Sequence, residues 1–209
     1  MISNHYDFIL FIGGIHGIIF NVITLTYASR KKITRPILYL NLVVLGISLT
    51  NIQAWAFTKD ITLYGFVLNY LELPWYVFSV PALYCFLLYF LQLKHNSSSI
   101  LRNLLVVFLV EIIFRLGVIS YCYYTDYTTD LIERYRQIEE SINAVIALFY
   151  LYKSYRIVFK RKEEYAFVLS FDTLVWLRNF MRLGGVVFLF WLLAIVLNFY
   201  YNNIVAYYP

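Results

Sequence analysis

Two ionisable residues of opposite charge, Glu111 and Arg115, stand four positions apart in an apolar part of the sequence. Residues 106–110 before them and 116–119 after them carry no charge. In a helix, side chains four positions apart lie on one face and can pair. Ionisable side chains inside a membrane cost about 2.5–3.5 kcal/mol each and usually face a cavity or the interior of a bundle. The pair predicts either an internal ion pair that helps helices associate or the charged lining of a ligand pocket or ion path.

His16 and Asn21 are polar residues in a second apolar stretch, beside Gly13, Gly14 and Gly17. Small residues allow helix backbones to approach closely. One interpretation is therefore a tight helix contact across which His16 forms a hydrogen bond. The other is an imidazole that responds to pH or to a ligand, because the unperturbed pKa of histidine is about 6.5.

Glu72 lies two positions before Pro74, at an interruption of a third apolar stretch. A carboxylate beside an interrupted helix is typical of the midplane binding sites of transporters. Alternatively, Glu72 lies at the outer headgroup level, where a charge costs little. Other polar residues of the apolar stretches are expected to connect helices rather than to bind substrate; these are Asn41, Asn51, Gln53 and Asn69.

Residue patterns typical of metal centres or catalytic sites do not occur in the sequence. The two cysteines, Cys85 and Cys122, lie in apolar surroundings, and the sequence contains no HExxH or CxxC motif. It also contains no Ser-His-Asp arrangement, glycine-rich phosphate loop or kinase signature. We therefore expect no metal, no cofactor and no enzymatic activity.

The composition determines the class of protein that must position these residues. Of 209 residues, 62% are hydrophobic and 14% are charged, and the mean hydropathy is +0.69. Soluble domains carry about 25% charged residues and do not expose large apolar surfaces. This excludes a soluble enzyme, a disordered chain or a DNA-binding domain as the bulk of the molecule. We predict an all-α, polytopic membrane helix bundle that forms a single domain over residues 1–209, with the lipid bilayer as its main partner.

A membrane span needs about 20 apolar residues, and six stretches meet this requirement. The predicted spans cover about residues 8–28, 36–57, 75–93, 103–122, 141–159 and 183–200. Residues 63–73, before the third span, are predicted to form a broken or re-entrant segment. Residues 164–182 are predicted to form an amphipathic cytoplasmic helix that lies in the interface before the chain turns into the sixth span.

The distribution of basic residues predicts the orientation of these spans. Clusters of Lys and Arg follow the first, third and fifth spans, around residues 30–35, 94–102 and 160–162. Cytoplasmic loops carry such an excess, so these loops face inward, and both ends of the chain and the acidic segment 123–140 face outward. The net charge of +5 therefore reflects membrane topology rather than nucleic-acid binding.

Three short motifs, taken in order, resemble a known family. They are Phe-Ile-Gly-Gly-Ile-His-Gly at 11–17, Pro-Ala-Leu-Tyr-Cys-Phe at 81–86, and Ser-Phe-Asp-Thr-Leu-Val-Trp-Leu-Arg at 170–178. Nearly the whole chain resembles the multi-spanning N-terminal sensor region of membrane-bound AraC-type helix-turn-helix regulators of Bacteroidota, which is related in architecture to some sensor histidine kinases. The resemblance implies a location in the bacterial inner membrane. It also implies a signalling or interface helix that contains Trp176, Leu177 and Arg178.

The chain departs from that family at several points. The family usually has glutamine at the position of His16, and its fourth span commonly begins His-Phe-x-Pro, where Asn-Leu-Leu-Val stands here at 103–106. The family also adds a seventh span and a cytoplasmic DNA-binding domain. The chain is therefore expected to be either the sensor part of a longer protein or a stand-alone relative. We expect no nucleic acid to bind these 209 residues.

Three functional classes fit these features. The first is a sensory or signalling module that responds to an unknown small or apolar ligand or to an envelope signal. The second is a small transporter or channel subunit with a polar path at Glu111 and Arg115. The third is a non-enzymatic membrane effector or assembly protein. A homo-oligomer or a membrane partner is compatible with each class.

Overall fold

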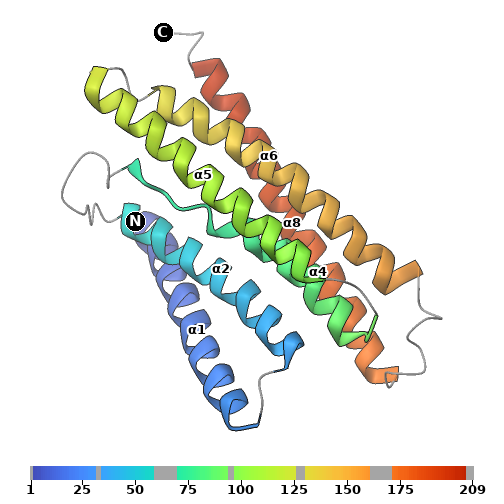
Figure 1. Ribbon diagram of the computed structural model, residues 1–209. Helices are drawn as coiled ribbons and strands as arrows, with labels where there is room; N and C mark the ends of the chain where they lie inside the picture. Colours follow the sequence, from blue (N-terminus) through green and yellow to red (C-terminus); the bar gives the residue numbers. More distant parts are fainter. Residues whose placement is uncertain are drawn as a thin grey trace. The chain divides into compact units, whose positions relative to one another are not determined.

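The computed structural model describes residues 2–31, 34–58, 70–93, 97–125, 130–160 and 171–205. Across these ranges the secondary structure is helical, without a strand, which confirms the predicted all-α fold. The α-helices are α1 (Ile2–Lys31), α2 (Arg35–Thr58), α4 (Ser79–Phe90), α5 (Ser97–Thr125), α6 (Asp130–Tyr155) and α8 (Phe171–Val205) (Figure 1). Two short helices complete the set: the 3₁₀ helix η1 (Trp75–Phe78) and the π-helical turn η2 (Arg156–Lys160).

Four helical segments are long and apolar enough to cross a membrane. They are Phe8–Tyr27, Arg35–Phe57, Ser99–Thr125 and Asp130–Lys160, and they contain most or all of the first, second, fourth and fifth predicted spans. The third predicted span corresponds to the shorter apolar segment Trp75–Phe90, and the sixth lies within α8. The protein is therefore an α-helical membrane protein.

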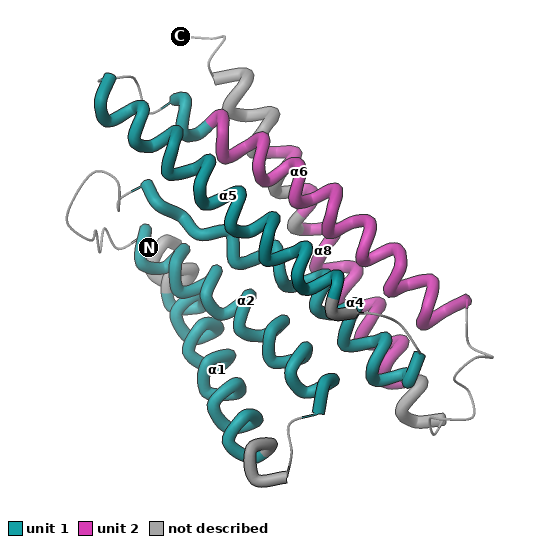
Figure 2. Tube along the Cα trace, in the orientation of Figure 1, with its two compact units in different colours: residues 1–133 teal, residues 134–209 magenta. Residues whose placement is uncertain are grey.

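The chain forms two compact units, residues 1–133 and 134–209, which we call unit 1 and unit 2 (Figure 2). Unit 1 contains α1, α2, η1, α4, α5 and the first turn of α6. Unit 2 contains the remainder of α6, η2 and α8. Each unit is described by itself below.

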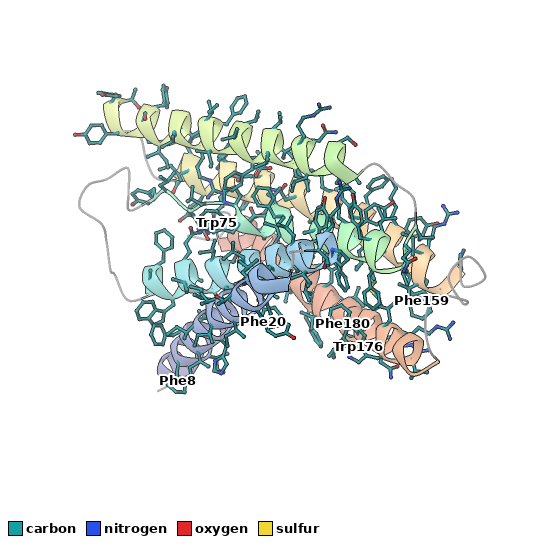
Figure 3. The ribbon with its side chains drawn as sticks, turned by 60° about the horizontal axis from the view of Figure 1, so that its bottom comes forward. Phe8, Phe20, Trp75, Phe159, Trp176 and Phe180 are labelled. Atoms are coloured by element: carbon teal, nitrogen blue, oxygen red, sulfur yellow. The ribbon has the colours of Figure 1, made fainter. Side chains whose placement is uncertain are left out.

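In unit 1, α1 and α2 lie side by side because glycines leave room for the neighbouring helix (Figure 1). A β-carbon on Gly17 would collide with Oγ of Ser48, and one on Gly14 would collide with Cγ1 of Ile52. The close helix approach predicted from these glycines is therefore present. The opposite side of α1 is exposed, as Phe8 and Phe20 show at 63% and 38% exposure (Figure 3).

The chain is not helical between residues 71 and 74, immediately before η1. Gln53 of α2 compensates for this break: its Nε2 donates to the carbonyl oxygen of Leu73 at 3.1 Å, and its Oε1 accepts from the amide of Leu73 at 3.0 Å. Non-helical backbone at membrane depth needs such protein partners. The broken segment predicted over 63–73 is thus present in its last residues, while its first part lies outside the described residues.

α2 and α4 are joined at two places. Near the middle of α2, Gly46 faces the carbonyl oxygen of Trp75 and Oγ of Ser79, which would lie 3.1 and 2.8 Å from an added β-carbon. At the start of α2, Nη1 of Arg35 donates to the Tyr89 hydroxyl at 2.7 Å. The first residues of α2 therefore meet the last residues of α4, as antiparallel neighbours must.

α4 ends in a hydrogen-bonding pattern that stops a helix. The Leu93 amide donates to the Leu88 carbonyl at 2.9 Å and the Gln92 amide to the Tyr89 carbonyl at 3.2 Å. Gln92 has a φ of 54°, the left-handed conformation that this C-terminal motif requires.

The last two long helices extend beyond the predicted spans. Residues 130–140, predicted as part of an acidic segment that faces outward, belong to α6, which begins at Asp130, because Asp130 and Glu133 in the first turn favour a helix N-terminus. The expected turn between residues 182 and 183 does not occur, since Phe171–Val205 is one helix. No proline lies in this range, and Gly184 and Gly185 weaken a helix without having to break it. Residues 164–170 of the predicted amphipathic helix lie outside the described residues.

Candidate functional site

The packed face of α5 carries the two charged residues singled out by their spacing. Leu104, Glu111, Arg115, Ile119 and Cys122 are all buried. Their separations of seven, four, four and three positions follow the period of a helix, so they form one stripe. The exposed side of α5 is apolar. Glu111 and Arg115 therefore occupy the middle of the interior face of this helix.

An apolar cluster lies on the N-terminal side of the charged pair. It is formed by Leu104 of α5 with Val77 and Phe78 of η1. The Phe108 ring packs against it, with its centre 4.9 Å from that of Phe78 and 5.4 Å from that of Trp75. These contacts fix the position of η1 along the axis of α5.

A second apolar cluster lies on the C-terminal side of the pair. Ile119 and Cys122 of α5 pack with Ile132 from the first turn of α6, and Leu71 packs against them. The charged pair is thus enclosed along α5 by apolar contacts on both sides. Such surroundings exclude water and strengthen electrostatic interactions.

Glu111 and Arg115 are 9% and 3% exposed, and both take part in polar or electrostatic interactions. The Glu-to-Arg order at i,i+4 is the favourable one along a helix. A buried ion pair is weak evidence for stability, since apolar residues of similar shape often do as well. We call Glu111 and Arg115 the charged centre of unit 1, and it is the candidate site that the structure favours.

His16 lies on the exposed side of α1 and does not join the contact with α2. Its Nδ1 lies 3.0 Å from the carbonyl oxygen of Ile12 in the same helix. A carbonyl oxygen only accepts, so Nδ1 carries the hydrogen in this bond. The predicted hydrogen bond across a helix contact is therefore wrong for His16: the glycines face α2, and the imidazole points elsewhere on the helix.

Asn21 is buried within unit 1 and belongs to the contact between α1 and α2. Its Nδ2 donates to the Gly17 carbonyl at 2.8 Å. One turn further, the Thr24 hydroxyl donates to Oδ1 of Asn41, and Nδ2 of Asn41 donates to the Ile37 carbonyl at 2.8 Å. The bond between Thr24 and Asn41 connects α1 to α2, as polar side chains in membrane proteins commonly do, whereas the bonds from Asn21 and Asn41 to carbonyl oxygens stay within their own helices. The structure therefore favours a packing role for Asn21.

Glu72 lies in the non-helical segment before η1 and is partly exposed. Its neighbour Leu71 packs on the cluster of Ile119 and Cys122, and its other neighbour Leu73 is held by Gln53. Leu71, the residue before Glu72, therefore lies beside the C-terminal part of α5, on the cluster that follows the charged centre.

Unit 2 contains buried polar residues on α6 that the sequence analysis missed. Glu139, Asn143 and Ser154 are 4%, 3% and 0% exposed. Together with Ala147 they repeat at helical spacing, which is the signal that identifies them. The sequence analysis assigns Glu139 to the acidic segment 123–140, because hydropathy alone places the start of the span at residue 141. The helical period of the buried positions shows that Glu139 belongs to the buried face of α6.

The segment with Trp176, Leu177 and Arg178 lies in the N-terminal third of α8. Leu177 is fully buried, whereas Trp176 is 54% exposed and its ring stacks on that of Phe180, with centres 5.4 Å apart. Arg178 is partly exposed. The segment therefore has one packed face and one exposed aromatic face.

Cys85 and Cys122 are both free and buried. The described residues contain no group of three or more metal-ligating side chains. Comparison with protein-family models, with curated proteins and with solved structures finds no match to this chain. Arguments about function therefore rest on the geometry of the chain itself.

Proposed function

We propose that the protein is a membrane signalling module in which the charged centre of unit 1 biases the packing of the helices around α5. The observation that carries this proposal is the burial of Glu111 and Arg115 in the middle of the α5 stripe, between two apolar clusters. An apolar pair at these positions would satisfy packing alone. Buried charges instead make the packing sensitive to any ligand or field that stabilises one arrangement.

A switch of this kind needs two packings of similar free energy and a signal that interacts differently with them. The short η1–α4 segment supports such a pair of states. It is held to α2 by the two Gln53 hydrogen bonds and to α5 by the Phe78 and Phe108 rings. A change at the charged centre alters the α5 side of η1 while the α2 side stays fixed.

α8 of unit 2 supplies the output helix of the proposal. It is a single helix of 35 residues, which corresponds to about 52 Å at 1.5 Å per residue. A continuous helix transmits a tilt or a shift along its whole length. In this proposal the segment with Trp176, Leu177 and Arg178 is the output end, on the cytoplasmic side of a bacterial inner membrane.

The resemblance to the sensor region of AraC-type regulators is part of the proposal. It predicts that the chain serves as the sensor part of a membrane-bound transcription regulator. The coding sequence downstream of Pro209 tests this: a seventh span followed by a helix-turn-helix domain supports it, and a stop codon directly after Pro209 contradicts it.

A distance measurement tests the switch. Spin labels at Leu45 of α2 and Leu105 of α5 lie on exposed positions, at 36% and 47% exposure, within unit 1. We expect the distance distribution in lipid nanodiscs to shift when both charges are removed in Glu111→Gln/Arg115→Gln. Identical distance distributions in the parent and in the folded double variant would contradict a switch. They would indicate that Glu111 and Arg115 serve only in helix packing.

A flux assay separates signalling from transport. Proteoliposomes of the parent protein are expected to show no more proton, sodium or potassium flux than empty liposomes. Flux that is present in the parent and lost in Glu111→Gln would contradict the signalling proposal and favour a transporter or channel with a polar path through the charged centre.

A further inference from the structure

Unit 2 carries three cations at the end where α6 and η2 meet α8. Lys160 is the last residue of η2, and Arg178 and Arg182 stand one turn apart on one face of α8. The guanidinium carbon of Arg182 lies 5.9 Å from the centre of the Phe159 ring, so α8 and η2 are in contact here. We call Lys160, Arg178 and Arg182 the basic cluster.

The arginines of the basic cluster favour an added anion. Like charges at i,i+4 destabilise a helix unless an opposite charge lies near them. In the part of the chain that the structure describes, Nε of Arg178 is buried without a hydrogen bond. Nη1 of Arg182 donates to Oδ1 of Asn179 at 3.5 Å, a long and therefore weak hydrogen bond. A negatively charged acceptor would satisfy both guanidinium groups.

The described carboxylates of α6 in unit 2 lie near the other end of that helix. They are Glu139 and Glu140, and Glu140 is already paired with Arg136 at 3.8 Å. In α8, Asp172 stands six positions before Arg178. Lys160 follows Glu140 by 20 positions, which corresponds to about 30 Å along a helix. Along α6 and η2, the described acidic side chains of unit 2 therefore lie toward one end and Lys160 lies at the other.

The sequence places the basic cluster near headgroup level. Lys160 opens the basic run Lys-Arg-Lys at 160–162, which follows the apolar stretch 141–159, and such basic runs are typical of the ends of membrane spans. Trp176 and Phe180 stack on α8 at the same end of unit 2, near Phe159 (Figure 3). Tryptophan and other aromatic side chains are typical of the membrane interface. The neighbouring turn η2 is π-helical, a geometry that is frequent at functional sites.

We propose that the basic cluster binds the phosphate group of an anionic phospholipid. The guanidinium groups of Arg178 and Arg182 donate to the phosphate oxygens as forks, and Lys160 adds a point charge. Basic pockets between helices on the cytoplasmic side of a membrane recognise anionic headgroups in this way. The exposed ring of Trp176 and the partly exposed ring of Phe180 pack against the acyl chains beneath the headgroup.

Native mass spectrometry of the full chain, released from detergent with added lipid, tests this. We expect one phosphatidylglycerol molecule to remain bound where phosphatidylcholine does not. The double variant Arg178→Gln/Arg182→Gln is expected to lower the bound fraction by about tenfold in apparent affinity, equivalent to about 1.4 kcal/mol. Arg178→Lys/Arg182→Lys keeps both positive charges but loses the two-pronged guanidinium hydrogen bonds. Its apparent affinity for phosphatidylglycerol is expected to lie between those of the parent and the glutamine variant.

Arg102→Gln/Arg134→Gln is the matched control, since it removes two exposed arginines elsewhere in the chain and is expected to leave lipid binding unchanged. Equal losses in the control and in the Arg178 and Arg182 variant would overturn the proposal, because they would indicate a general charge effect. The lysine variant keeps the proposal testable if the glutamine variant does not fold.

Thermal unfolding with different anions distinguishes the source of the phosphate. Phosphatidylglycerol is expected to raise the melting temperature, and inorganic phosphate at the same concentration is not. Equal shifts would overturn the lipid assignment. Glu163 and Glu164 lie outside the described residues and supply carboxylates from the same chain. A large loss of stability in Glu163→Gln/Glu164→Gln, without any phosphatidylglycerol binding by the parent, would show that the chain provides its own anion.

Discussion

At the scale of single residues, the charged centre makes a prediction that separates charge from shape. Removing one partner of a buried ion pair leaves an uncompensated charge, which costs about 3–5 kcal/mol. We therefore expect Glu111→Gln and Arg115→Gln each to lower stability by about that amount. The double variant Glu111→Leu/Arg115→Met is expected to be as stable as the parent. Unfolding in detergent by titration with denaturant measures all three, and a double variant as unstable as either single variant would contradict the pairing.

Gly17 and His16 are sequence neighbours with opposite expectations. A side chain at Gly17 collides with Ser48, so Gly17→Val is expected to cost about 1–3 kcal/mol through overpacking. His16 is exposed, so His16→Phe is expected to stay within about 0.5 kcal/mol of the parent. Thermal unfolding measures both. As a control, the double variant Gly17→Ala/Ser48→Gly is expected to be more stable than Gly17→Ala, because removing the Ser48 side chain makes room for the added methyl group. A Gly17→Val variant as stable as the parent would show that α1 and α2 are not in close contact.

At the scale of elements, the broken segment before η1 depends on one side chain of α2. Gln53 satisfies both the amide and the carbonyl of Leu73. Gln53→Leu leaves two backbone groups without these bonds, at about 1–3 kcal/mol for each group that stays unsatisfied. We expect faster hydrogen exchange at the Leu73 amide and lower stability. Gln53→Glu keeps the acceptor and is expected to protect that amide partly; unchanged exchange in both variants would contradict this role.

The helices themselves could be predicted from the sequence, but some of their ends could not. Apolar runs located the six α-helices in the part of the chain that the structure describes, because a span requires a continuous apolar stretch. The start of α6 at Asp130 was missed since residues 130–140 are polar, although their acidic residues suit a helix N-terminus. The continuity of α8 was not predicted. The amphipathic pattern before residue 183 and the fully apolar pattern after it indicate two different environments, so two helices were expected. Hydropathy indicates which part of a helix suits the membrane, and it does not indicate where the helix begins or ends.

The site could be predicted only where charge and burial coincide. Glu111 and Arg115 could be predicted because a charged side chain within an apolar span usually faces the interior of the helix bundle rather than lipid. The hydrogen bond of His16 across the helix contact was wrong, since the glycines beside it define the contact face and the histidine lies off that face. The alternative, an imidazole that responds to pH or to a ligand, stays a prediction. Glu139 and Asn143 were missed because the buried face of α6 is polar, and the sequence does not show which helix covers it.

At the scale of the whole molecule, the predicted orientation can be tested at two exposed positions. Thr34 lies between α1 and α2, and Thr125 is the last residue of α5. The distribution of basic residues predicts that Thr34 is cytoplasmic and Thr125 is outside. A membrane-impermeant thiol reagent applied to intact cells is expected to label Thr125→Cys and not Thr34→Cys. The native cysteines are buried and serve as the unlabelled control; the reverse pattern would invert the topology.

One measurement tests most directly whether α5 is a membrane helix with the charged centre on its interior face. Spin labels placed singly at each position from 104 to 122 in nanodiscs report collisions with oxygen, which concentrates in lipid, and with a water-soluble nickel chelate. We predict an oxygen signal that oscillates with a period of about 3.6 residues, with minima at 104, 111, 115 and 119 and maxima at Ile113 and Phe114. High nickel accessibility at 111 and 115, or an oxygen signal without a period, would contradict the account.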